Sequence, residues 1–148
     1  MRTYIPSLLI LLVCSLGLSH SAQAQKGTVI AKVMDFESTD GKLALTLYNK
    51  EKGFPEELEY AVETRILDLN GRDVMVVRWD NLPYGDYALA GHHDANSNGE
   101  MDYNWVGIPK EGYCFSNDVK PVLSAPDFSD AKFRLGQEKL TLYIHMQN

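Results

Sequence analysis

The sequence predicts an all-β fold: an antiparallel β-sandwich of about seven strands, immunoglobulin-like or transthyretin-like, with one long Asp/Asn-rich loop. Apolar residues recur at every second position in several short segments, the pattern of strands that turn one face to a core. Gly, Asn, Asp and Pro separate these segments and favour turns. Residues 94–129 are long and poor in strand pattern, which is typical of a functional loop.

Each predicted strand has an apolar face. In order along the chain these faces are Val29, Ala31 and Val33; Leu43, Leu45 and Leu47; Met75, Val77 and Trp79; Tyr87 and Leu89; Ala131, Phe133 and Leu135; and Leu140, Leu142, Ile144 and Met146. A short helical turn is expected at Pro55 to Tyr60 because Pro suits a first helical position, and a strand is expected after it, up to Leu69. Asp40-Gly41 and Asn70-Gly71 predict hairpin turns.

The N-terminal segment predicts export. Arg2 precedes an apolar stretch that ends where Ala22 and Ala24 form an A-x-A cleavage site. We therefore expect residues 1–24 to be a signal peptide and residues 25–148 to be a single β-sandwich domain. The apolar stretch is short for a membrane span, and no second one follows, so no span is expected after cleavage. An uncleaved anchor is the alternative. The protein is expected in the periplasm or outside the cell.

The net charge and the cysteine content limit the binding partners and the cysteine chemistry that can be expected. The chain carries 14 Lys and Arg against 20 Asp and Glu, a net charge of -6. Such an acidic domain is not suited to nucleic acid or anionic lipid, but it suits cations. Cys114 alone remains after cleavage at Ala24, so no internal disulfide is expected. A buried, inert thiol is favoured over a nucleophile because no flanking motif supports catalysis.

Alternate residues after Asp94 predict a weak calcium site. The run reads D-x-N-x-N-G-x-x-D-x-N, the start of a calcium loop of the EF-hand type. Calcium takes six to eight oxygen ligands, and short Asp and Asn side chains present oxygen without pushing the backbone away. The Gly at position six permits the sharp turn. The predicted ligands are Asp94, Asn96, Asn98, Glu100 through its backbone carbonyl, Asp102 and Asn104.

The match to a calcium loop is incomplete. Trp105 occupies position twelve, where a bidentate Glu is expected, and the flanks are not helices. A further carboxylate from Glu111, Asp86 or Asp118 is expected to complete the shell. The alternatives are a solvated turn without an ion, or a transition-metal site at His92, His93 and Asp94. Adjacent strand residues point to opposite faces, which argues against both histidines binding one ion.

The loop and its flanks together resemble the bacterial domain-of-unknown-function family 2141 (DUF 2141). The resemblance rests on four segments: Leu82 to Ala88, His93 to Asn104, Gly107 to Asn117, and Pro126 to Phe133. It implies a small exported β-sandwich without an assigned activity, with the Asp/Asn loop on Asp94, Asn96, Asn98 and Asp102. Cys114 stands where the family pattern has Gly. If that Gly adopts a positive φ, Cys114 would be strained there.

Three function hypotheses follow. The first is a non-enzymatic structural or binding module in which calcium orders the long loop. Most of Tyr103, Trp105, Tyr113 and Phe115 are then expected to point inward, and exposed ones would suit a peptide or carbohydrate partner. The second is a hydrolase that uses His93, Asp94 and Glu111. The third is an accessory subunit that contacts an envelope protein through a sheet edge.

Overall fold

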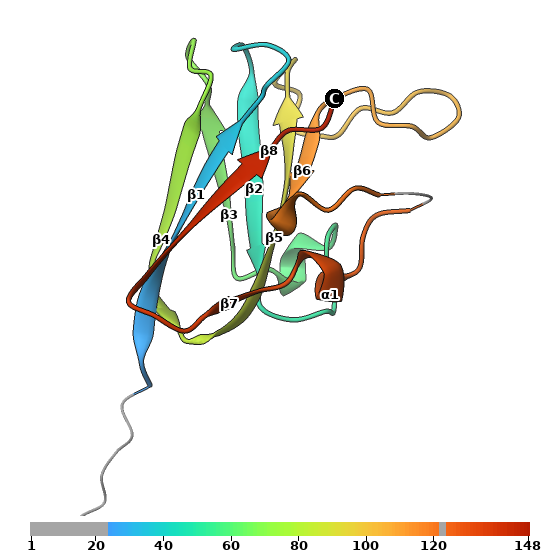
Figure 1. The fold of residues 1–148 in the computed structure, drawn as a ribbon. Coiled ribbons are helices and arrows are strands. Elements are labelled where there is room, and N and C mark those ends of the chain that lie inside the picture. Colours follow the sequence, from blue (N-terminus) through green and yellow to red (C-terminus); the bar gives the residue numbers. More distant parts are fainter. Residues whose placement is uncertain (1–23, 122–123) are drawn as a thin grey trace, which may run out of the picture.

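A computed structural model describes residues 24–121 and 124–148, which form eight strands in two sheets (Figure 1). The predicted β-sandwich is confirmed. All but the last residue of the predicted signal peptide lies outside the described residues. The strands are β1 (Lys26–Met34), β2 (Lys42–Tyr48), β3 (Glu63–Asp68), β4 (Met75–Pro83), β5 (Gly85–Asp94), β6 (Tyr113–Phe115), β7 (Phe133–Leu135) and β8 (Lys139–His145). The short helices are η1 (Leu58–Tyr60), η2 (Ser116–Asp118) and α1 (Phe128–Ala131).

The two sheets differ in strand direction. The small sheet has the order β4-β1-β8, in which β1 is antiparallel to β4 but parallel to β8. The large sheet has the order β3-β2-β5-β6 with antiparallel pairs throughout, and β7 pairs with the start of β5. The parallel pair departs from the wholly antiparallel expectation. Alternation has a period of two in either direction, so it determines which face is buried but not the direction of the neighbouring strand.

Two predicted hairpin turns join different sheets instead. The Asp40-Gly41 turn carries the chain from β1 in the small sheet to β2 in the large one. The Asn70-Gly71 turn leads from β3 back to β4, again between sheets. Both residues of the second turn have the positive φ values expected of them, 51° and 78°. The local geometry of the Asn70-Gly71 turn was therefore predictable, whereas the pairing of the strands on either side was not.

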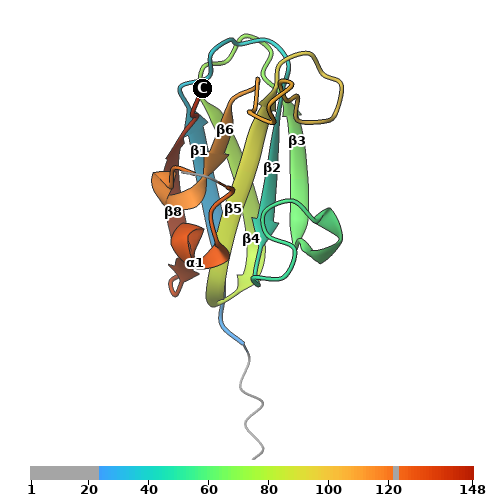
Figure 2. The same ribbon diagram turned by 90° about the vertical axis from the view of Figure 1, so that its right-hand side faces the viewer.

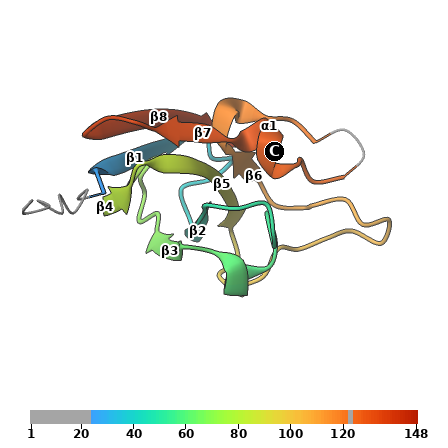
Figure 3. The same cartoon turned by 90° about the horizontal axis from the view of Figure 1, so that it is seen from below.

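Figure 3 shows the two sheets as two layers, and the buried apolar side chains that form the core lie between them. The predicted inward residues of β1, β2, β4 and β5 are buried, and Ile144 and Met146 join them while Leu140 and Leu142 are partly buried. A second cluster covers the opposite face of the large sheet. Its buried members are Tyr48, Ala88, Ala90, Phe115, Phe128 and Ala131.

The segment from Pro55 to Leu69 agrees in part with its prediction. The expected helical turn is shorter than predicted and forms only the 3₁₀ helix η1. The expected strand is β3, which pairs with β2 and forms one edge of the large sheet. Within the described part of the chain, no helix has the length and apolar character to cross a bilayer.

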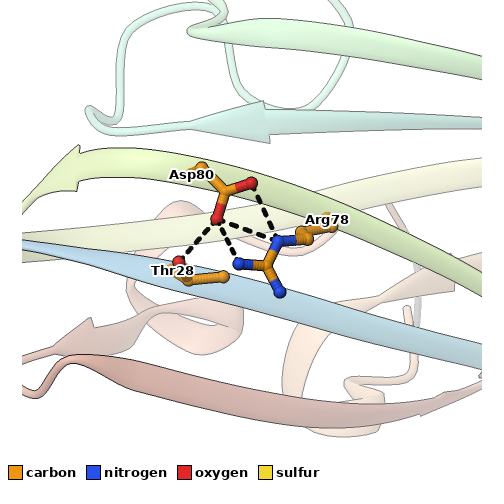
Figure 4. Close-up of polar contacts among 3 residues, drawn as sticks. All are labelled: Thr28, Arg78 and Asp80. Carbon is orange, nitrogen blue, oxygen red and sulfur yellow. Dashed lines mark hydrogen bonds and ion pairs between the residues drawn. The ribbon is translucent and has the colours of Figure 1, made fainter.

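Three polar side chains, Thr28, Arg78 and Asp80, are hydrogen-bonded on the outer face of the small sheet (Figure 4). Asp80 on β4 accepts hydrogen bonds from the Thr28 hydroxyl on β1 at 2.7 Å and from Arg78 Nε at 2.8–2.9 Å. These contacts tie β1 to β4 on the solvent side, where the core residues of the same strands do not reach.

Candidate functional site

The predicted calcium loop leaves the end of β5 and returns to the sheet as β6 (Figures 1 and 2). It lies at the same end of the molecule as the β1–β2 turn, which packs against its first residues. Gly41 in that turn has a φ of 76°, and a Cβ there would collide with the backbone of Asp94 and Ala95. The close approach therefore requires glycine and holds the start of the loop against the sandwich.

Asp94 organises the turn that follows it. Its side chain is buried, with 3% of the residue exposed. One carboxylate oxygen accepts the backbone N–H of Asn98 at 3.0 Å, and the other accepts that of Gly99 at 2.9 Å. Gly99 has a φ of 86°, so the predicted sharp turn at loop position six is present. Asp94 thus curls the next five residues around its own carboxylate.

Asn96, Asn98 and Asp102 come together in this turn. Asn96 Nδ2 donates to one oxygen of Asp102 at 2.6 Å, and Asn98 Nδ2 donates to the other at 3.3 Å. The two Asn carbonyl oxygens accept the backbone N–H groups of Asn98 and Glu100. Four of the six predicted ligand residues, at positions one, three, five and nine, are therefore linked to one another by hydrogen bonds or by the turn they form.

The other two predicted ligands lie differently. Glu100 is exposed and contributes its backbone N–H to the turn. Asn104 does not face Asp102, because its side-chain oxygen accepts the N–H groups of Val106 and Ile108 at 3.0 Å each. It caps a second small turn instead. Sequence spacing alone does not reveal this competing use of an Asn side chain.

Of the three carboxylates considered for completing the shell, only Glu111 is at the loop. It is 8% exposed and accepts the N–H of Ala95 at 3.0 Å and that of Asp102 at 3.1 Å. It thereby ties the beginning of the loop to its end. Asp86 pairs instead with Lys132 and Arg134 near β7.

Asp118 is engaged elsewhere as well. Both of its carboxylate oxygens interact with His145 on β8, one with the backbone N–H and one with Nδ1, each at 2.8 Å. This contact raises the pKa of His145, first through the hydrogen bond and then through the charge of Asp118. It joins η2 to β8 and takes no part in the loop.

The loop carboxylates have no cationic partner among the described residues. The ion pairs found there involve Asp80, Asp86, Asp118 and Glu63, but not Asp94, Asp102 or Glu111. Among the residues that the structure describes, backbone N–H groups provide the only hydrogen bonds to the side chains of Asp94 and Glu111. In the same part of the chain, no three His, Cys, Asp or Glu side chains are grouped to hold a metal. The loop instead combines carboxylates with amides.

The two histidines lie on opposite faces of β5, as their adjacency requires. His93 faces inward, is 2% exposed, contacts the ring of Phe36 and places Nε2 2.7 Å from the carbonyl oxygen of Asp40. His92 faces outward and lines a groove on the large sheet. Burial lowers the pKa of His92, although Glu111 and Asp94 act in the opposite direction. His93, the residue on which the hydrolase hypothesis depends, does not line that groove.

The loop aromatics divide evenly, contrary to the expectation that most point inward. Phe115 is buried and Tyr113 is partly buried, and both belong to the cluster on the large sheet. Tyr103 is 53% exposed and Trp105 is 95% exposed. The bridge between Tyr103 and Pro109 makes the intervening residues a narrow turn. Such a turn offers Trp105 no surface to pack against.

Cys114 fits its position without backbone strain. It lies in β6, and its φ is not positive. It faces Gly91 of β5, where a Cβ would approach Cys114 Sγ to 3.2 Å. Burial raises the pKa of the thiol to about 12, so the group is protonated at neutral pH. This agrees with the expected buried, unreactive cysteine.

A family model matches residues 31–142, and its description is "Uncharacterized protein conserved in bacteria (DUF2141)". No curated protein and no solved structure matches the chain. The matched region includes most of the sandwich, the whole loop and the segment that follows it. Because it spans well over half of the sequence, the chain belongs to the DUF2141 family.

Proposed function

We propose that the protein is an exported, non-enzymatic structural or binding module whose loop 94–104 binds one calcium ion weakly. Asp94, Asn96, Asn98 and Asp102 would hold the ion with their side chains, and Glu100 would add its backbone carbonyl. Calcium would neutralise the carboxylates and hold together the two ends of the loop.

The observation that carries this proposal is the buried carboxylate of the proposed ligand Asp94, which has no cation beside it among the described residues, together with the likewise unpaired carboxylate of Glu111, which holds the two ends of the same loop. Asp94 and Glu111 are 3% and 8% exposed, and neither forms an ion pair within the described residues. Burying a carboxylate is costly unless a positive charge or several hydrogen bonds compensate. The backbone N–H groups compensate in part, and a hard dication with oxygen ligands would supply the remainder.

The side-chain oxygens available in the loop also support calcium binding. An Asn carbonyl oxygen has two lone pairs, so it can accept a backbone N–H and still face an ion. The hydrogen bonds from Asn96 and Asn98 to Asp102 would be exchanged for oxygen contacts with calcium. With only two charged ligands, a Kd of about 10⁻⁴–10⁻³ M is expected, as in extracellular calcium modules.

Thermal unfolding with calcium and with chelator tests the proposal. At about 10 mM calcium a Kd in this range stabilises the native state by roughly 1.4–2.7 kcal/mol, which corresponds to a rise in Tm of several degrees. Asp102→Asn preserves the shape of the side chain but removes a charge, so it is expected to abolish most of this rise. Glu100→Gln alters an exposed side chain beside it and should leave the rise intact. An unchanged Tm in the unaltered protein would refute the proposal.

The export part of the proposal has its own test. Residues 1–24 would be removed, so mass spectrometry of protein recovered from a bacterial periplasm should find an N-terminus at Gln25. Replacing Ala22 and Ala24 by Asp, which is too large and charged for an A-x-A site, should prevent cleavage. Full-length protein accumulating in the cytoplasm of the unaltered strain would contradict export.

A further inference from the structure

The large sheet carries a groove on the face that points away from the core. Its volume is about 760 Å³. The floor consists of the outward side chains of Ala44, Thr46, Ala90 and His92 on β2 and β5, with the backbone of Gly91 between the last two. Because small side chains stand on both strands, the floor lies low between its walls. One wall comes from Pro55, Leu58 and Ile66, and the other from Met101, Tyr103, Ile108 and Pro109.

The walls of the groove are apolar and exposed to solvent. Leu58 is 59% exposed, Ile66 is 66% exposed and Ile108 is 58% exposed, and all three line the groove. Exposed large apolar side chains gathered around one concavity are typical of a binding site, whereas scattered ones are not. The volume falls in the range of about 300–1,000 Å³ that is common for small-molecule sites.

The charges around the groove are negative. Among its described lining residues, Glu56 and Glu100 are acidic and none is Lys or Arg. His92 is the only imidazole among them, and its Nε2 is enclosed without a hydrogen-bond partner in the described part of the chain. The carboxylates of Glu111 and Asp94 lie close enough to act on this ring. The groove therefore disfavours an anion and favours a cation.

We propose that this groove binds a small apolar molecule with a cationic amine end. The apolar body would cover Ala44, Ala90 and Ile66, and the amine would lie toward the carboxylates of Glu56 and Glu100. This site is distinct from the calcium loop, although Gly99, Glu100, Met101 and Tyr103 of loop 94–104 also line the groove. It does not require calcium, because its floor and one wall belong to the strands and to the segment before β3.

A fluorescent reporter makes the site measurable. N-phenyl-1-naphthylamine is uncharged and gains fluorescence in apolar surroundings. It is titrated into residues 25–148 in the presence of a calcium chelator and then displaced by decylamine, decanol or decanoate below their aggregation concentrations. These three competitors share one aliphatic chain and differ in the charge of the head group. Because no calcium is present, a failure of the calcium proposal leaves this experiment unaffected.

The expected order of displacement is decylamine, then decanol, then decanoate. Pairs of exposed charges change affinity by small factors, so decylamine should act at about one-third of the decanol concentration and at about one-tenth of the decanoate concentration. The double variant Glu56→Gln with Glu100→Gln should remove the preference for the amine while leaving reporter binding intact. Equal displacement by decanoate and decylamine would overturn the charge assignment and with it the proposed ligand class.

Two wall variants locate the binding. Leu58→Ser and Ile66→Ser replace exposed apolar side chains and are therefore tolerated by the fold. Each should weaken reporter binding by about fivefold, since apolar contact area is lost. Val76→Ser is the matched control, because Val76 is 56% exposed on the small sheet, away from the groove. Reporter binding that is absent, or that is weakened no more by the wall variants than by Val76→Ser, would overturn the proposal.

Discussion

Asp80 shows how strongly local hydrogen bonds act on an exposed side chain. On the outer face of the small sheet, its carboxylate accepts hydrogen bonds from the Thr28 hydroxyl and from the Arg78 guanidinium (Figure 4). These contacts lower the pKa of Asp80 to about 2, with the Arg78 hydrogen bond as the largest cause. The folded-state pKa is thus below the unfolded one. The associated stabilisation is complete above the unfolded value and is lost as the pH falls through about 2.

Asp80→Asn tests this pH dependence. The substitution removes the ionisable group, so the decrease of Tm between about pH 4 and pH 2 should be shallower in the variant than in the unaltered protein. Asp73→Asn is the control, because Asp73 is exposed and lies in a turn outside this contact. Differential scanning calorimetry across this range provides the measurement. Identical Tm profiles for Asp80→Asn and the unaltered protein would show that the exposed pair does not contribute.

Gly91 and Cys114 show how far the surroundings of a single residue can be predicted from the sequence. The departure from the family pattern at Cys114 suggested strain, but the backbone there is part of strand β6 and has no positive φ. The sulfur finds space because glycine stands opposite it on β5. This pairing was unpredictable, since residues 91 and 114 are adjacent only through strand register. Burial of Cys114, in contrast, was predictable from its chemical type and neighbours.

Glu111 holds the long loop as a structural element. Its two carboxylate oxygens accept N–H groups at residues 95 and 102, so one side chain spans the segment in which the calcium residues lie. Glutamine has a single acceptor oxygen, and its amide nitrogen would face an N–H group. Glu111→Gln should therefore lower the free energy of unfolding by about 1–3 kcal/mol. Urea denaturation followed by circular dichroism measures the change.

The matched control for this change is Glu100→Gln. Glu100 belongs to the same loop, but its side chain is exposed and the residue takes part in the turn only through its backbone N–H. Its substitution is expected to alter stability by less than about 0.5 kcal/mol. If both variants unfold at the same urea concentration as the unaltered protein, Glu111 does not fasten the loop.

At this scale the sequence predicted element types better than their partners. Alternation identified the strands and their buried faces, because burial of one face imposes a period of two. The groove escaped notice because it arises from pairing: Ala44 on β2 faces His92 on β5, and Ile66 on β3 lies beside Ala44. The Asp/Asn spacing predicted that Asn96, Asn98 and Asp102 lie together, and both Asn side chains donate hydrogen bonds to Asp102; the calcium ion stays a prediction. The spacing did not predict that Asn104 would cap the next turn.

The whole sandwich is joined along one side by the end of the chain. Gln147 exchanges two backbone hydrogen bonds with Tyr113 of β6, at 2.8 and 2.9 Å. Its side chain also donates to the carbonyl oxygen of Val119 at 3.0 Å. Residues after β8, a strand of the small sheet, are thereby hydrogen-bonded to the edge of the large sheet. The opposite side, with edge strands β3 and β4, has no such β-bridge among the described residues.

Deleting residues 147 and 148 should therefore loosen the two sheets from each other. Three hydrogen bonds of Gln147 and the one from Asn148 to Asp35 would be lost. At about 1 kcal/mol for each, the free energy of unfolding should fall by roughly 3–4 kcal/mol. Deletion of Asn148 alone is the control, since it also moves the terminal carboxylate but removes only the exposed contact to Asp35.

Urea denaturation of both truncated proteins compares the two losses, and amide exchange reports where the structure opens. The N–H of Tyr113 should exchange faster in the two-residue deletion, because its acceptor is the carbonyl of Gln147. The N–H of Leu45, in the middle of the large sheet, should change only with global stability. Since β6 begins directly after Glu111 and Gly112, freeing Tyr113 should also weaken calcium stabilisation of the loop. Equal urea midpoints for the one-residue and two-residue deletions would mean that the core alone keeps the two sheets together.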